Sequence, residues 1–248
     1  MDKMKKVYFR LKNKIKLYIQ INWIKTIYIN FKMLSFYQAK KLPIVIFGKC
    51  AFKNLDGKIF LEGKAYFGRI VIGQRYQLFI KEKGISEFQI IGELTFKGRM
   101  QFGTDCQFYV AKNAVCIFGD MSSMGNSSTL ICTQKITFGK FCRAGAEAYF
   151  ADSNFHSMKN TITGEVYPKS FEIELGNYNF IGTRVTILGK TKTPDYCTIA
   201  SCTLINKNFY QLGRNILLGG IPAKLVKEQI VRDWEGERAS LEKYLKIL

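Results

Sequence analysis

The stretch that decides the fold is "LGNYNF IGTRVT ILGKTK TPDYCT IASCTL IN", residues 175–206. Every sixth residue is aliphatic with one exception, and these positions are Leu175, Ile181, Ile187, Thr193, Ile199 and Ile205. A second series of mostly small residues lies four positions further on: Asn179, Val185, Thr191, Cys197 and Thr203. A helix repeats about every 3.6 residues and an amphipathic strand every two, so neither explains a period of six. The period instead predicts a coiled parallel β-sheet whose short faces each turn one aliphatic side chain inward.

Upstream segments follow the same rule. "FGTDCQ" (102–107), "FGKFCR" (138–143) and "AGAEAY" (144–149) fit it well, and "IGQRYQ" (72–77) and "IGELTF" (91–96) fit it loosely. Cys106, Cys142 and Cys197 share the fourth place after the aliphatic residue, so we expect small buried side chains rather than ligands or nucleophiles. The seven cysteines include no CxxC pair and the chain has one histidine, which predicts no metal site and a reduced, cytoplasmic setting.

The period breaks around the only histidine. It runs through Phe138, Ala144 and Phe150 and resumes at Leu175, an interval that is not a multiple of six. The polar insert 151–174 therefore leaves the coil as a loop, and His156 lies near its beginning, just outside the coil edge.

Two C-terminal segments complete the pattern. "IASCTLINK" (199–207) and "LLGGIPAKLVKE" (217–228), together with the period over about 44–224, resemble the hexapeptide-repeat acyltransferases, most closely the sugar and polysaccharide O-acetyltransferases. The resemblance implies an all-β fold, a left-handed parallel β-helix over 44–220 with the loop 151–174. A basic helix/strand segment (1–43) precedes it and a C-terminal α-helix (221–248) follows. The resemblance also implies a homotrimer with each site between neighbouring chains.

The resemblance implies an activity as well. The enzyme would move an acetyl group from acetyl-CoA directly to a sugar hydroxyl of a glycan or polysaccharide precursor, with His156 of "DSNFHS" as general base. Asp152 and Asn154 are the local candidates for orienting the imidazole, and a backbone carbonyl serves equally well. Asp152 also fits a second role, that of stabilising the turn at the loop entrance.

Residues of the acyl donor and acceptor sites follow by similarity. The coenzyme A set is Phe180, Thr183, Ala200, Ser201, Asn206, Lys207 and Lys224. Asn126 and Ser128 in "MGNSSTL" (124–130) are weaker candidates for the acceptor sugar. The chain departs from the family pattern at Asn206, where relatives commonly carry Thr, and at Thr193–Pro194, which replaces an aliphatic–Gly pair.

The N-terminal segment is strongly basic. The whole chain has 38 Lys+Arg and 19 Asp+Glu, and residues 1–41 hold 11 basic residues and one acidic residue. Apolar residues at helical spacing within 1–18 predict an amphipathic helix, and "IYINF" (27–31) alternates like a strand. The helix would either contact an anionic membrane surface peripherally through 1–41 or pack on the protein with a solvated lysine face. No run approaches the roughly 20 apolar residues of a membrane span.

Other functions remain to be separated from this one. The charge suits nucleic acid, but no recognised binding motif occurs, so we expect no nucleic-acid partner. A β-helix carbonic anhydrase needs a zinc site with several histidines, and the chain has one. Transfer to an amino sugar or a serine, and a non-catalytic basic β-helix binding module, stay open.

Overall fold

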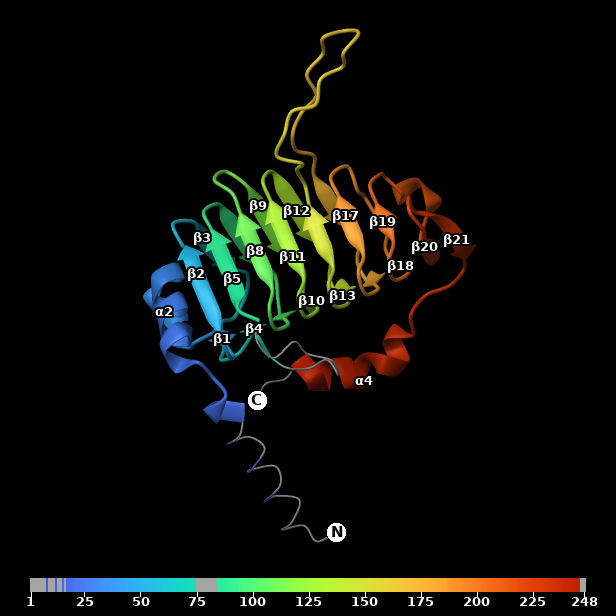
Figure 1. Cartoon of the computed structure of the whole chain (residues 1–248). Helices are drawn as coiled ribbons and strands as arrows, with labels where there is room; N and C mark the ends of the chain where they lie inside the picture. Colours follow the sequence, from blue (N-terminus) through green and yellow to red (C-terminus); the bar gives the residue numbers. More distant parts are fainter. Residues whose placement is uncertain (1–7, 9–11, 13–14, 16, 75–83, 246–248) are drawn as a thin grey trace.

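The computed structural model describes residues 8, 12, 15, 17–74 and 84–245. Three sheets run along the molecule as the faces of a prism, so that each turn of the chain adds one strand to each sheet (Figure 1). All pairs of neighbouring strands are parallel except β20 and β21, which are antiparallel. This is the predicted left-handed parallel β-helix.

The strands of each sheet are neighbours in the order given. The first sheet contains β1 (Ile44–Ile46), β4 (Ile70–Ile72), β7 (Met100–Phe102), β10 (Ser122–Met124), β13 (Arg143–Ala144), β16 (Phe180–Ile181), β18 (Cys197–Ile199), β20 (Ile216–Gly219) and β21 (Lys224–Glu228). The second sheet contains β2 (Cys50–Asn54), β5 (Ser86–Ile90), β8 (Gln107–Val110), β11 (Thr129–Cys132), β14 (Tyr149–Ala151), β17 (Thr186–Leu188) and β19 (Leu204–Ile205). The third sheet contains β3 (Lys58–Leu61), β6 (Glu93–Phe96), β9 (Val115–Phe118), β12 (Lys135–Phe138) and β15 (Ile173–Leu175).

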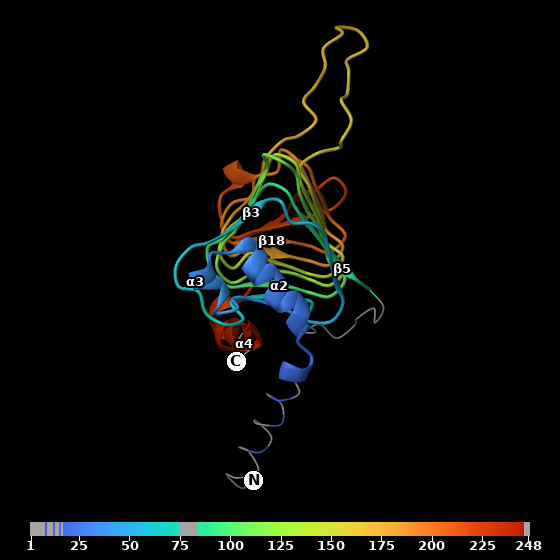
Figure 2. The same ribbon diagram turned by 90° about the vertical axis from the view of Figure 1, so that its left-hand side faces the viewer.

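Helices lie outside the prism. Helix α2 (Trp23–Met33) crosses its N-terminal end, with α3 (Phe36–Ala39) beside it (Figures 1 and 2). A short 3-10 turn (Tyr210–Leu212) follows β19, and α4 (Trp234–Leu245) lies along one side. Trp234 and Leu241 of α4 pack with Met121 in a small buried cluster near the corner where the third sheet meets the first.

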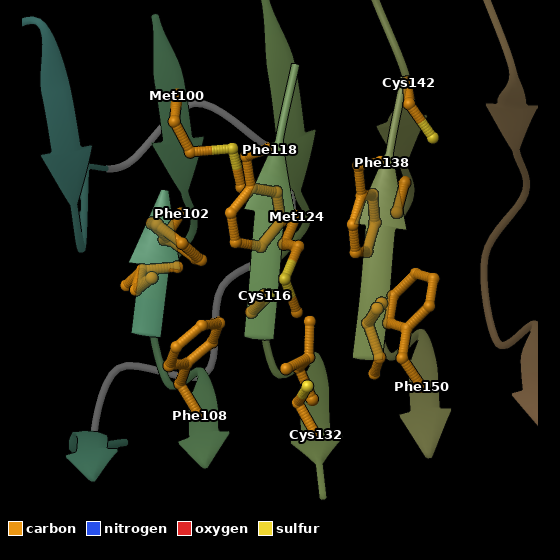
Figure 3. Packing of buried hydrophobic residues seen from close by; sticks show 14 of the residues in the cluster. Met100, Phe102, Phe108, Cys116, Phe118, Met124, Cys132, Phe138, Cys142 and Phe150 are labelled. Carbon is orange, nitrogen blue, oxygen red and sulfur yellow. The ribbon is translucent and has the colours of Figure 1, made fainter. Parts of the chain in front are cut away.

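The interior confirms the sixfold pattern. All six residues of the first series between 175 and 205 are buried, and so are the five residues of the second series. Upstream, large rings fill the prism, and Phe118, Phe138 and Phe150 follow one another with ring centroids 4.7 and 5.0 Å apart (Figure 3). Stacked aliphatic and aromatic side chains on successive coils therefore form one continuous core.

The cysteines at the repeated fourth place are buried thiols, as expected. Burial raises the pKa of the Cys106 and Cys197 thiols to about 12, and it raises the pKa of Cys142 as well. A protonated thiol of this kind packs as a small hydrophobic group. Of the seven cysteines only Cys202 is exposed.

The period of eighteen residues per coil holds only near the C-terminus. Phe180 pairs with Thr198, and Thr186 pairs with Leu204, each eighteen residues later. Earlier coils are longer, because Met100 pairs with Ser122 and Ser123 pairs with Arg143. The segment "IGELTF" is consequently out of phase by one: the inward residues there are Ile90, Leu94 and Phe96, and Ile91 is only half-buried.

Two predictions for the ends of the chain were wrong. Residues 27–31 belong to helix α2, because their apolar positions also match a helical stripe with Trp23 and Ile24. The C-terminal helix begins at Trp234 instead of 221, since Lys224–Glu228 first pairs with β20 as a strand. The helix predicted within 1–18 lies mostly outside the described residues.

Candidate functional site

The predicted loop corresponds to residues 152–172, between β14 and β15. It projects far from the prism at the corner between the second and third sheets (Figures 1 and 2). Antiparallel bridges join Ser153 to Ser170 and Lys159 to Val166, so the two arms of the loop run side by side. His156 lies on the outgoing arm and is exposed.

Asp152 anchors the loop entrance. Its side chain is buried, and one carboxylate oxygen accepts hydrogen bonds from Thr133 N (2.7 Å) and Thr133 Oγ1 (2.8 Å). The other oxygen accepts from Gln134 N (2.7 Å) and Lys135 N (2.9 Å). Thr133 Oγ1 also lies 2.7 Å from Ser170 Oγ, which links the entrance to the returning arm. Of the two roles that the sequence leaves open for Asp152, these contacts match that of a turn-stabilising residue.

Asn154 holds the backbone next to the histidine. With its amide nitrogen turned toward the loop, it donates to His156 O (2.7 Å) and Lys169 O (3.2 Å). Ser153 Oγ accepts from Phe155 N (3.0 Å), and Phe155 has a positive φ of 62°. The turn before His156 is therefore fixed by main-chain contacts, and within the described residues no hydrogen-bond partner meets the imidazole itself.

A pocket of about 230 Å³ lies at the base of the loop. It brings together Asp152, Asn154 and Asn206, which the sequence placed in two different sets. Its other lining residues are Ala151, Ser153, Lys169, Phe171, Leu188, Gly189 and Lys190. The ammonium of Lys190 lies 4.1 Å from the centroid of the Phe171 ring.

Sequence reasoning missed Lys169, Phe171 and Lys190. Gly189 and Lys190 occupy the corner that follows β17, directly below the point where the loop leaves and returns. A Cβ atom on Gly189 would lie 2.9 Å from Phe171 O and 3.1 Å from Asp152 O, so the coil passes closely beneath the loop. The sequence feature that could have indicated these residues is the Gly189–Lys190 pair, at a corner next to the loop.

Thr183, Ala200 and Ser201 gather at another corner, between the first and second sheets. Thr183 N donates to Ser201 Oγ (3.1 Å), and Cys202 N donates to Thr183 O (2.9 Å). The strands of the second sheet lead from this corner to the loop corner, so the two corners lie at opposite ends of those strands. One chain therefore does not place His156 beside Thr183 and Ser201.

The remaining residues of the predicted coenzyme A set are spread over the C-terminal coils. Phe180 points outward from the first sheet, and the guanidinium of Arg232 lies 4.8 Å from its ring centroid. Lys207 is exposed, with its ammonium 5.2 Å from the Phe209 ring. Lys224 is exposed at the start of β21, opposite Gly219.

Asn126 and Ser128 do not reach the surface. Both are buried, Asn126 Oδ1 accepts from Thr104 N (3.0 Å), and Ser128 Oγ accepts from Ala148 N (3.2 Å). Their short polar side chains satisfy backbone groups of neighbouring coils at a narrow corner. This placement does not agree with their predicted role in binding the acceptor, and we leave them out of the site.

Two features are absent from the part of the chain that the structure describes. The described residues contain no group of three or more His, Cys, Asp or Glu side chains arranged to hold a metal ion. None of their helices combines the length and the hydropathy that crossing a membrane requires.

Comparison with known proteins finds one similar sequence and solved structures of similar fold. No protein-family model matches the chain. An uncharacterised 24.8 kDa protein in the cps region of Klebsiella pneumoniae is 25% identical over 200 residues, 81% of this chain and 86% of that protein.

Among solved structures, the polySia-specific acetyltransferase NeuO superimposes with a TM-score of 0.53 and 13% identity, covering 82% of this chain and 97% of its own. AntD, an N-acyltransferase from Bacillus cereus in complex with dTDP and 3-hydroxybutyryl-CoA, gives a TM-score of 0.47 and 14% identity over 87% and 97% of the two chains. The chain therefore has the left-handed parallel β-helix fold of the hexapeptide-repeat acetyltransferases, and the resemblance in its sequence is confirmed at the level of the fold.

Proposed function

We propose that this protein is an acyl-CoA-dependent O-acetyltransferase that transfers the acetyl group of acetyl-CoA to a sugar hydroxyl of a glycan or polysaccharide precursor. The observation that carries the proposal is the position of the only imidazole. His156 projects from the coil edge on a loop whose base is fixed by buried contacts. The fold shared with NeuO, a polySia-specific acetyltransferase, supports the same class of reaction.

The chemistry requires one base and a site for negative charge. Neutral His156 takes the proton of the sugar hydroxyl while its oxygen attacks the thioester carbonyl carbon. Backbone N–H groups at the coil corner stabilise the tetrahedral oxyanion. The carbon–sulfur bond then breaks, the acetyl ester is released, and the imidazolium returns its proton to the departing thiolate of coenzyme A. No covalent acyl-enzyme forms.

Asp152 and Asn154 serve as positioning residues in this proposal. Asp152 fixes the loop entrance through Thr133, Gln134 and Lys135, and Asn154 holds the carbonyl of His156. Together they hold the main chain on either side of the turn, so the imidazole starts from a defined backbone position. In this proposal the group that orients the second nitrogen of the imidazole comes from the site formed between subunits.

The assembled site needs a second copy of the chain. His156 and the corner formed by Thr183, Ala200 and Ser201 lie at opposite ends of the strands of the second sheet. We propose a homotrimer in which the loop of one subunit faces that corner on its neighbour, and the pantetheine arm runs between them. Asn206, Lys207 and Lys224 would then contact coenzyme A, with Phe180 as an apolar wall.

The free thiols bear on the compartment in which the protein works. Seven cysteines remain free in the structure, and we propose that the reaction takes place in the cytoplasm.

Transfer of radiolabelled acetyl from acetyl-CoA to glycan acceptors tests the proposal. His156→Ala should lower kcat by about 10²–10⁴-fold with little change in KM for acetyl-CoA. Ile162→Ala is the matched control, because Ile162 lies on the same loop and is 94% exposed. Equal activity of wild type and His156→Ala would contradict the catalytic role, and a product that resists mild alkali would identify an amide and contradict transfer to oxygen.

A further inference from the structure

Helix α2 buries polar as well as apolar residues, since Ile29 and Met33 lie in the core on the same side as Thr26 and Asn30. Its face toward the β-helix carries the polar residues Thr26 and Asn30, both fully buried. Asn30 donates to Ile44 O (2.6 Å) and accepts from Ile44 N (3.1 Å), and Thr26 Oγ1 accepts from Ile46 N (3.0 Å). Strand β1 is the edge of the first sheet, so these side chains satisfy backbone groups that the first coil leaves unpaired. Thr26 and Asn30 of α2 thus close the edge of the sheet.

The outward face of α2 is apolar as well. Ile24 is 81% exposed, and Ile27, Tyr28 and Phe31 continue the stripe at helical spacing. Phe36 (73% exposed) and Tyr37 of α3 extend it, and the rings of Phe31 and Phe36 meet edge to face with centroids 6.0 Å apart. We call these six residues the apolar cap face; α2, which carries most of it, crosses the N-terminal end of the prism in Figure 2. A contiguous apolar patch of this kind on a soluble surface marks an interaction site.

Lysines border the apolar cap face. Lys25 and Lys32 lie beside the stripe on α2, and the ammonium groups of Lys40 and Lys41 lie 5.2 and 4.4 Å from the Tyr37 ring centroid. The sequence contains no Asp or Glu between residues 3 and 55. Any partner on this surface therefore meets apolar and aromatic side chains with only positive charge around them.

We infer that the apolar cap face docks on an anionic lipid bilayer. Aliphatic and aromatic side chains at helical spacing enter the boundary between headgroups and acyl chains, tyrosines suit the headgroup level, and flanking lysines approach lipid phosphates. A second copy of this chain would bring the same positive charges together, which disfavours self-association through this face. The inference is independent of the proposed chemistry, and docking leaves the loop 152–172 uncovered because it projects from the middle coils, away from α2 (Figure 1).

Co-sedimentation of the full chain with vesicles tests the inference. The protein should bind phosphatidylglycerol-containing vesicles, bind pure phosphatidylcholine vesicles much more weakly, and lose affinity as salt rises. Equal binding to both vesicle types, or binding to neither, would overturn it. So would light scattering that shows a larger assembly for wild type than for an apolar cap face variant, because that result identifies a second copy as the occupant.

Variants separate the surface from the rest of the basic segment. Ile24→Ser/Phe31→Ser should weaken binding to anionic vesicles by about tenfold or more, and Lys25→Glu/Lys32→Glu by a similar factor. Phe60→Ser/Ile85→Ser is the matched control, since both residues are 44% exposed apolar side chains outside the face. Circular dichroism and acetyl transfer to a soluble acceptor should not change in any of them. Unchanged vesicle binding in both sets of variants would refute the docking surface and leave the proposed function intact.

Discussion

Replacement of Asp152 by Asn tests how the loop is held. The carboxylate is 1% exposed and accepts four hydrogen bonds, two on each oxygen, of which three come from backbone N–H groups. An amide keeps one acceptor oxygen and turns an NH2 group toward two donors. Hydrogen bonds to a charged group contribute about 1.5–3 kcal/mol each, and at least two are lost. Partial hydration of the loop entrance offsets some of this cost, so we expect a loss of about 3 kcal/mol in unfolding free energy.

The expected change is measurable by thermal unfolding. For a chain of this size, about 1 kcal/mol lowers the unfolding midpoint by roughly 2–4 °C, so Asp152→Asn should lower it by about 6–12 °C. Asp195→Asn is the control. Asp195 is exposed, and its Oδ1 accepts hydrogen bonds from Asn177 N and Asn177 Nδ2, which the oxygen of an amide can still accept. The cost of this substitution should stay below about 1 kcal/mol. A midpoint within about 1 °C of wild type for Asp152→Asn, combined with lost acetyl transfer, would show that Asp152 acts directly on the imidazole and would refute the anchoring argument.

Three further changes probe the remaining parts of the molecule. Ser201→Trp fills the exposed corner beside Thr183, so KM for acetyl-CoA should rise at least about tenfold in steady-state kinetics, while loss of the exposed hydrogen bond from Thr183 N should cost no more than about 1 kcal/mol of stability. Trp234→Ala removes the buried anchor of α4 and should cost about 3–5 kcal/mol and expose the tail to limited proteolysis. Because burial holds the pKa of Cys106 and Cys197 at about 12, above the model-compound value of 9.0, the unfolded chain releases these protons first. Stability should therefore fall as pH rises from 9 toward 12, and less steeply in a Cys106→Ala/Cys197→Ala variant.

The C-terminal coils were predictable because their geometry imposes one rule on every turn. Each face there accommodates six residues, so Leu175, Ile187 and Ile205 recur at fixed intervals and all point inward. Earlier coils take twenty or more residues per turn, and the additional residues sit in the corners. The inward positions then drift out of phase, which is why Ile90 replaces Ile91 in the core.

The N-terminal helix was harder to recognise. Its outward face is apolar, and its buried face mixes Thr26 and Asn30 with apolar residues, so the short run 27–31 matched an alternating strand equally well. Only the unpaired edge of β1 explains why the polar residues are inside, and that edge is a tertiary feature. A local pattern carries no information about it.

The site was predictable in its parts and not in its arrangement. The interrupted period located the loop and His156, and the resemblance to the hexapeptide-repeat acyltransferases suggested Thr183 and Ser201. The contacts of Asp152 with residues 133–135 are made to the preceding coil. The burial of Asn126 likewise depends on its contact with Thr104 in the coil before it. These contacts join segments about twenty residues apart, so spacing along the chain does not reveal them.

A structure of the protein with coenzyme A bound would show where the thioester lies relative to His156. We expect the sulfur atom within hydrogen-bond reach of the His156 imidazole, directly or through one water molecule, and the pantetheine arm along Thr183 and Ser201 of a neighbouring subunit. Coenzyme A bound away from the loop, or bound with the imidazole of every subunit turned to bulk solvent, would contradict this expectation.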